Sequence, residues 1–198
     1  SKLLNAVPNI EHYFSDAMAN GATNFFRCHQ VHDKQIITLT NQKRDAIASQ
    51  KADGLFTANY CSLAVQTADC IPALFTTNDG KCIAAVHAGW RGVHLGILPE
   101  TVRRFQTAGI SAQHIVVALG PSIGSCCFEV GQNVIDIFQD DWKHLKIMES
   151  AISSDPKRKA ARQSGLFLDL KKIAVAQLLE AGVPLKNIDT IQTCTYCA

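Results

Sequence analysis

Two apolar runs near the middle of the chain, residues 64–75 and 82–92, show the hydrophobic pattern of buried strands. An Asn-Asp-Gly-Lys turn signal separates them, so the runs are predicted to pair as an antiparallel hairpin. Each run contains polar chemistry that an apolar core does not need, Asp69 and Cys70 in the first and His87 in the second. Cys70 lies about eight residues before the turn and His87 about seven after it, so the hairpin is expected to bring them together.

The rest of the pattern predicts a mixture of strands and amphipathic helices. Runs rich in β-branched and aromatic residues predict strands at residues 24–32, 35–40, 55–57, 62–67, 115–119 and 188–194. Apolar residues at helical spacing predict helices at residues 9–20, 97–109, 133–142 and 167–182. Asp169 is a candidate N-cap for the last of these helices, and residues 41–51 fit either a loop or a short helix.

Length and composition favour one globular domain with a small-molecule partner. The chain has 198 residues, is 47% hydrophobic and carries a net charge of only +2, so nothing indicates binding to nucleic acid or to an anionic membrane. Eight cysteines without a signal peptide or a long apolar span indicate reduced thiols in the cytoplasm. The chain lacks an initiator methionine and ends just after a strand-like segment, so we expect truncation at both ends.

Two histidines and one cysteine on three separate segments are candidates for a metal site. In an extended strand His29 and His32 point to opposite faces, and His32, at the strand's end, is the more accessible. Together with Cys70 and His87, His32 would form a three-ligand zinc site with an open fourth position. Spacing alone also permits simple packing roles, or a nucleophilic pair in which Cys70 attacks while His87 withdraws its proton.

Other polar residues fit weaker interpretations. Glycine-flanked Arg91 lies near the start of a predicted helix, where a guanidinium and backbone amides can hold an anion. The loop at residues 120–124 could wall a pocket. The adjacent pair at residues 126–127 is interpreted as small buried hydrophobes. The Cys-x-x-Cys motif at residues 194–197 has no second such pair to complete a four-thiolate zinc site, so packing is expected there too.

Five motifs in order resemble one known family. They are Gln30-Val-His32, Ala52-Asp-Gly54, Thr67-Ala-Asp-Cys-Ile-Pro72, His87-Ala-Gly-Trp-Arg-Gly92, and Gly120-Pro-Ser-Ile123 with Phe128-Glu-Val130. This combination resembles the laccase-domain family, whose members are also described as multicopper polyphenol-oxidase-like proteins, purine nucleoside phosphorylases and peptidoglycan editing factors. The resemblance covers most of the chain and implies an α+β fold over residues 1–198, a single-domain mixed β-sheet sandwich with flanking helices.

The resemblance also implies a cofactor and an activity. It implies that His32, Cys70 and His87 are metal ligands, with zinc as the usual metal. The implied reactions are phosphorolysis of adenosine, inosine, guanosine or methylthioadenosine and hydrolytic deamination of adenosine, so the expected partners are a purine nucleoside and phosphate. Copper-dependent phenol oxidation ranks lower, because one His2Cys site lacks the extra histidine clusters of a multicopper oxygen-reducing centre.

The resemblance suggests further site residues. Catalytic roles are expected for Cys70, His87, Asp69 and Arg91, and substrate contacts for Arg91, Gly120 and Ser122. Asp69 could orient a ligand or move a proton, or act only through hydrogen bonds behind the ligands. The resemblance also leads us to expect a glycine-rich N-terminal segment and a C-terminal Ser-Tyr-Arg-Arg strand, and these 198 residues contain neither. A metal-independent cysteine hydrolase and a non-enzymatic metal-binding module remain as alternatives, and the oligomeric state is open.

Overall fold

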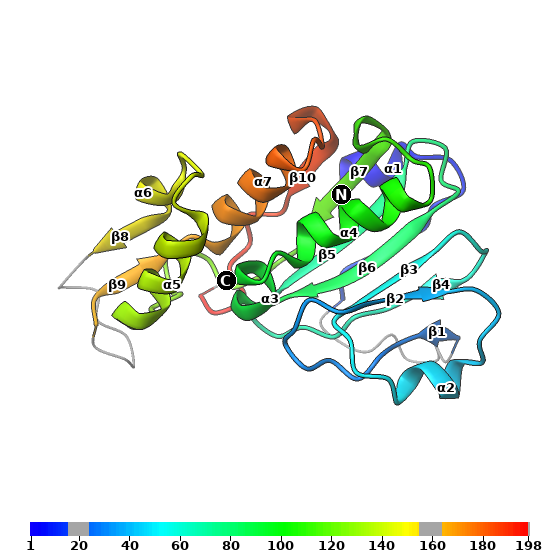
Figure 1. The fold of residues 1–198 in the computed structure, drawn as a ribbon, viewed down its shortest axis with the longest axis horizontal. Helices are drawn as coiled ribbons and strands as arrows, with labels where there is room; N and C mark the ends of the chain where they lie inside the picture. Colours follow the sequence, from blue (N-terminus) through cyan, green and yellow to red (C-terminus); the bar gives the residue numbers. More distant parts are fainter. Residues whose placement is uncertain (16–23, 155–163, 198) are drawn as a thin grey trace.

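A six-stranded mixed sheet forms the centre of the protein in a computed structural model, which describes residues 1–15, 24–154 and 164–197 (Figure 1). The strands lie in the order β10-β7-β5-β6-β3-β2. Their bounds are β2 Ile36–Leu39, β3 Gly54–Thr57, β5 Ile71–Thr77, β6 Ile83–Ala88, β7 Ile115–Leu119 and β10 Ile188–Thr190. The two outer pairs, β10 with β7 and β2 with β3, are parallel, whereas the inner pairs are antiparallel.

The central hairpin β5–β6 confirms the prediction from the apolar runs. Its register pairs Pro72 with His87, and Gly80 turns the chain with a φ of 70°. Cys70 comes directly before β5, so it lies beside the end of β6 that carries His87. Pro72 is the second residue of β5, and the pairing of β5 with β7 begins only at Ala73, so the proline lies at the end of the strand.

The two faces of the sheet bury different helices because side chains alternate along each strand. On one face, Ile115, Val117 and Leu119 join the large core with the helices α3 (Trp90–His94), α4 (Ile97–Thr107) and α7 (Leu170–Glu180). On the other face, Val116 and Ala118 pack with the short helix α1 (Lys2–Asn5). The predicted Asp169 cap of α7 is confirmed, since its side chain accepts a hydrogen bond from the Lys172 amide.

Smaller elements flank this sheet on two sides (Figure 1). Beyond β2 lie α2 (Arg44–Ala48) and the parallel pair β1 (Phe25–Phe26) and β4 (Ser62–Leu63). On the far side of α3 and α7 lie α5 (Gln132–Trp142), α6 (Met148–Ala151) and the hairpin β8 (Ile152–Ser154) with β9 (Leu166–Leu168). Single 3-10 turns, η1 (Ala112–His114) and η2 (Leu185–Asn187), lead into β7 and β10.

Several predicted elements differ from the structure. No helix forms over residues 9–15, and residues 16–20 of the predicted helix lie outside the described residues. Asn9 adopts a φ of 60°, and Ile10 and Phe14 reach the α1 cluster from non-helical chain, so the apolar spacing serves packing without a helix. The predicted strand over residues 24–32 is reduced to β1 and an isolated bridge at His29. The strand predicted at residues 62–67 shrinks to β4, and residues 166–168 extend before α7 begins.

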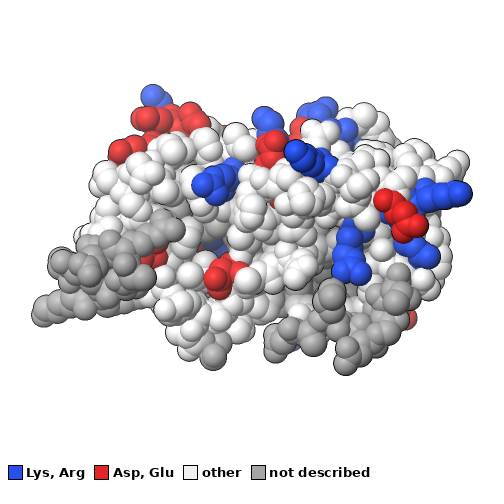
Figure 2. Space-filling model, turned by 90° about the horizontal axis from the view of Figure 1, so that it is seen from below, with Lys and Arg blue, Asp and Glu red and all other residues white. Residues whose placement is uncertain are grey.

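The α+β class with a mixed sheet and flanking helices is confirmed. Lysine, arginine and acidic side chains are interspersed over the face seen in Figure 2, with no continuous basic stripe on it. Among the described helices, none combines the length and the apolar character that a membrane span requires.

Candidate metal centre

Three predicted ligands meet at one end of the central hairpin. His32 comes from the loop before β2, Cys70 precedes β5, and His87 lies in β6. One ligand atom from each side chain lies within 4.8 Å of the others. The two imidazole rings meet edge to face with centroids 4.7 Å apart. The structure therefore brings together the three side chains that the sequence placed on separate segments.

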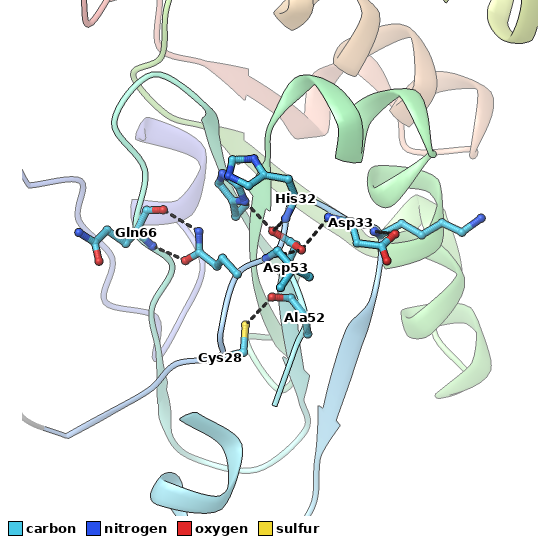
Figure 3. Close-up of polar contacts among 10 residues, drawn as sticks. Cys28, His32, Asp33, Ala52, Asp53 and Gln66 are labelled. Atoms are coloured by element: carbon cyan, nitrogen blue, oxygen red, sulfur yellow. Dashed lines mark hydrogen bonds and ion pairs between the residues drawn. The ribbon is translucent and has the colours of Figure 1, made fainter. Parts of the chain in front are cut away.

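Asp53 organises this cluster, although sequence reasoning did not select it as a site residue. Its fully buried carboxylate accepts the His87 Nδ1–H at 2.7 Å and the backbone amides of Val31, His32 and Asp33 at 3.1, 2.9 and 2.8 Å. Figure 3 shows these contacts converging on Asp53 from the His32 loop. Asp53 directly precedes a strand whose residues are all buried. A buried carboxylate without a partner costs free energy, so this position alone could have indicated that Asp53 has a polar partner.

The Asp53 contact sets the protonation of His87. Burial lowers the pKa of His87, but the hydrogen bond to Asp53 and the neighbouring Cys70 outweigh burial and raise the pKa to about 9. Burial raises the pKa of the Asp53 carboxyl, but His87 and the three amides outweigh it and lower that pKa below its ordinary value. Because Asp53 engages Nδ1, the Nε2 atom of His87 is left for a ligand.

Backbone geometry and a glycine leave room between the ligands. His32 adopts a φ of 60°, which is uncommon for a residue with a Cβ. The hydrogen bond that the His32 backbone N–H donates to the Asp53 carboxylate holds this conformation in place. A Cβ on Gly89 would lie 3.0 Å from Cys70 Sγ and 3.2 Å from His32 Nδ1. The absence of a side chain at this position keeps the space beside the ligands open.

The donor set fits a divalent metal of the zinc type. Ligand atoms around a tetrahedral zinc ion lie about 3.3–3.8 Å apart, given bonds of about 2.0–2.1 Å to nitrogen and 2.3 Å to sulfur. The observed limit of 4.8 Å is within a small side-chain adjustment of that geometry. Two imidazoles and one thiolate leave a fourth position for a substrate, as in catalytic sites. A carboxylate that orients one imidazole ligand is a recurrent companion of such sites.

The other predicted catalytic residues contact different partners. Asp69 is exposed and its carboxylate accepts the Thr195 hydroxyl at 2.8 Å, so it holds the C-terminal segment. The Arg91 guanidinium is exposed and lies 4.5 Å from the centroid of the Trp90 ring. A catalytic role for Asp69 and an anion-binding role for Arg91 remain predictions.

Gly120 and Ser122 are packed inside the loop that follows β7. A Cβ on Gly120 would lie 2.5 Å from Phe14 Cε1 and 2.7 Å from Pro72 Cγ, so this position requires glycine. Ser122 is fully buried and its hydroxyl donates to the Ile123 carbonyl oxygen at 3.5 Å. Direct substrate contact by these two residues stays a prediction that their packing does not favour.

Two pairs of cysteines, at residues 126–127 and 194–197, differ from their prediction. Cys126 is exposed and Cys127 half-buried, so the interpretation as buried hydrophobes is wrong for Cys126. The pair at 126–127 also lies beside the pair at 194–197, which was predicted to have no second pair. Burial raises the pKa of Cys194, but nearby backbone amides and the Cys126 thiol outweigh burial and lower it to about 6.

Most of the chain is similar to known proteins. A family model described as multi-copper polyphenol oxidoreductase laccase matches residues 5–198. A Synechocystis protein named purine nucleoside phosphorylase slr1573 is 32% identical over 189 residues, which cover 86% of this chain and 70% of that protein. The protein named adenosine deaminase RL5, from an unknown prokaryotic organism, is 33% identical over 135 residues, covering 68% and 48% of the two chains.

A solved structure has the same fold. The crystal structure of Bacillus licheniformis hypothetical protein YfiH superposes with a TM-score of 0.76 and 28% identity, covering 87% of this chain and 65% of that chain. The chain thus spans between 48% and 70% of the length of these three proteins.

Proposed function

The chain belongs to the multi-copper polyphenol oxidoreductase laccase family, and from this premise we propose that it is a zinc-dependent enzyme acting on purine nucleosides. The carrying observation is the convergence of His32, Cys70 and His87 from three segments around one point. Relatives named purine nucleoside phosphorylase and adenosine deaminase support a nucleoside as the substrate. The proposed reactions are phosphorolysis of adenosine, inosine, guanosine or methylthioadenosine and hydrolytic deamination of adenosine, in a cytoplasmic protein.

Zinc is proposed rather than copper because of the ligand set. A multicopper oxygen-reducing centre needs several histidine clusters, whereas within residues 1–15, 24–154 and 164–197 one candidate metal group contains histidine. A buried carboxylate behind one imidazole and an open fourth position favour Lewis-acid chemistry. Zinc bound there would supply the Lewis acidity that polarises the reacting centre of the substrate.

The chain's own residues divide the remaining tasks. Asp53 holds the Nδ1 proton of His87, which fixes the ring orientation and directs Nε2 toward the open space. Arg91 is exposed and always charged, so it is proposed to bind phosphate during phosphorolysis. Asp69 is proposed to keep the segment before Cys70 in place through Thr195, with proton transfer as a further proposed role.

Metal analysis followed by two incubations tests this function. The purified full chain is expected to hold zinc at the His32 site, and Cys70→Ser and His87→Ala are expected to lose that ion. Adenosine incubated with phosphate should release adenine, and adenosine without phosphate should yield inosine. Cys61→Ser is a matched control, because Cys61 lies outside both clusters of potential ligands. Turnover that survives removal of the ion would refute a zinc-dependent reaction.

A metal-independent cysteine hydrolase is the second candidate, because the thiol of Cys70 contacts the buried His87 that could accept its proton. This alternative requires Cys70 and His87 but has no use for His32. His32→Ala discriminates between the two functions: a zinc enzyme should lose its activity, whereas a thiol hydrolase should keep both its activity and rapid alkylation of Cys70.

A further inference from the structure

A second group of potential metal ligands lies outside the His32 site and consists only of cysteines. Cys126 and Cys127 belong to a turn between β7 and α5, whereas Cys194 and Cys197 belong to the segment after β10. All four sulfur atoms lie within 4.8 Å of one another. We call this group the four-cysteine cluster. Cys126 and Cys197 are 71 residues apart in the sequence, so the cluster is visible only in the folded chain.

The sulfur distances fit a bound ion better than a disulfide. Cys126 Sγ and Cys197 Sγ are 3.5 Å apart, and no disulfide joins any of the described cysteines. A disulfide requires about 2.05 Å between sulfurs. Around a tetrahedral zinc ion, bonds of about 2.3 Å place neighbouring sulfurs about 3.8 Å apart. The Cys126–Cys197 separation is close to that value and every other sulfur separation is at most 4.8 Å, so only small side-chain shifts separate the cluster from a tetrahedral site.

Backbone contacts hold the two segments in register around the sulfurs. The Gly124 amide donates to Cys194 Sγ at 3.2 Å, and the Cys127 amide closes the turn by donating to the Gly124 carbonyl at 2.9 Å. A Cβ on Gly124 would lie 3.1 Å from Cys126 Sγ and 3.4 Å from Cys194 Cβ. The Thr195 amide donates to the Ser122 carbonyl at 3.2 Å. An amide donor to sulfur stabilises a thiolate ligand, so the Gly124 contact would support Cys194 as a metal ligand.

Simple packing does not account for this arrangement. Cys126 and Cys197 are exposed, whereas cysteines used as small hydrophobes are buried. Their sulfurs nevertheless converge with those of Cys127 and Cys194. In contrast, Cys82 is buried in the core, and it belongs to no cluster of potential ligands among the described residues.

We propose that Cys126, Cys127, Cys194 and Cys197 bind one structural zinc ion, which clamps the C-terminal segment to the loop after β7. Four thiolates close the coordination shell, so this ion has a structural and not a catalytic role. Binding converts the remaining thiols to thiolates and releases their protons to the solvent. The proposal shares no ligand with the His32 site and stands whether or not the nucleoside chemistry is correct.

The clamp reaches the proposed catalytic centre through Asp69. Thr195, between the two C-terminal cysteines, donates its hydroxyl to the Asp69 carboxylate at 2.8 Å. The Ile123 amide, in the loop before Cys126, donates to the Asp69 carbonyl at 2.9 Å. Asp69 therefore contacts both clamped segments and precedes Cys70 directly in the chain. Loss of the ion should loosen the backbone that presents Cys70.

Zinc stoichiometry in the full chain tests the second site. Protein purified under reducing conditions with added zinc is expected to hold about two ions per chain. The double variant Cys126→Ser, Cys197→Ser should hold about one zinc ion per chain, as should the double variant Cys70→Ser, His87→Ala. The control variant Cys61→Ser should hold about two zinc ions. X-ray absorption of the Cys70→Ser, His87→Ala variant should then show four sulfur neighbours at about 2.3 Å from zinc.

Different outcomes separate this proposal from the proposed function. Two zinc ions in the Cys126→Ser, Cys197→Ser variant would overturn the four-cysteine site. A single zinc ion in the wild type that is lost in the Cys70→Ser, His87→Ala variant would also overturn it. Iron with sulfide in the cluster, or a disulfide in protein that takes up no metal there, would also overturn it. If the double serine variant does not fold, the absorption spectrum of the Cys70→Ser, His87→Ala variant decides, because its cysteine cluster is intact. Absence of nucleoside turnover would affect only the other proposal.

Discussion

Asp53→Asn tests whether one buried carboxylate positions the metal ligands. In the wild type, one oxygen of Asp53 accepts His32 N–H and His87 Nδ1–H, and the other accepts the amides of Val31 and Asp33. An asparagine keeps only one oxygen. If that oxygen keeps the first two contacts, its NH2 group faces two other donors, so two hydrogen bonds are lost.

The expected magnitude follows from those two contacts. Each buried donor left without an acceptor costs about 1–3 kcal/mol, which gives a loss of about 2–6 kcal/mol in the free energy of unfolding. That is a large part of the roughly 5–15 kcal/mol that stabilises a typical domain. Removal of a carboxylate behind a metal-bound imidazole should also weaken zinc affinity by about 10–100-fold. The pKa of His87 should fall, because the hydrogen bond to Asp53 helps to raise it.

Urea denaturation of the zinc-free protein measures the first effect, and competition with a chromophoric chelator measures the second. Asp45→Asn is the matched control, because Asp45 is exposed at the start of α2 and its replacement should change stability by less than about 0.5 kcal/mol. The reasoning would be refuted if Asp53→Asn matched that control in both stability and zinc affinity.

Three other measurements address the same site. Gly89→Ala should weaken zinc binding by about tenfold, because its Cβ would crowd Cys70 Sγ and His32 Nδ1. The fold should be retained, since the backbone φ of −71° suits alanine. Unchanged affinity in a chelator titration would contradict this prediction. Zinc must displace the proton that His87 binds with a pKa of about 9, so apparent affinity should rise with pH up to that value and then level off. A flat profile between about pH 6 and 9 would exclude this proton competition. Arg91→Ala should reduce phosphorolysis by about 10- to 100-fold and spare deamination, because one charged contact with phosphate is lost. Adenine formed from adenosine measures phosphorolysis, and inosine measures deamination. An equal loss of both activities would refute phosphate binding by Arg91.

The central hairpin could be predicted from the sequence because its information is local. A turn signal between two apolar runs predicts which strands pair, and the spacing from the turn placed Cys70 near His87. The observed register sets Pro72 opposite His87, two residues from Cys70. Strands at the margin of the sheet were less predictable. The run at residues 24–32 has strand composition, yet Asp53 holds residues 31–33 by their amides and His32 turns with a positive φ. A tertiary contact overrides local propensity there.

The four-cysteine cluster could not be predicted because its two halves are brought together only by strand order. β7 and β10 are parallel neighbours, so the chain leaving each strand emerges at the same end of the sheet. In sequence, a Cys-x-x-Cys motif without a second such motif argues against a four-thiolate site, and the adjacent pair at 126–127 does not have the usual spacing. The usual sequence rules look for two cysteines separated by two residues in each half of a zinc site. Here the turn closed by the Cys127 amide and the Gly124 carbonyl presents two adjacent cysteines instead.

The strand order also explains how two proposed metal sites can influence each other without sharing a ligand. β5 pairs antiparallel to β7, so β5 begins where β7 ends, and Cys70 and Asp69 lie beside the loops that carry the four-cysteine cluster. The Gly120 amide donates to the Pro72 carbonyl at 2.8 Å, so the loop after β7 also contacts the first residues of β5. A structural ion at the cluster would therefore hold the end of the sheet that presents Cys70. On this basis, zinc affinity at the His32 site should fall when the cluster is disrupted, whereas loss of the His32 site should leave the cluster intact, since four thiolates close their own shell.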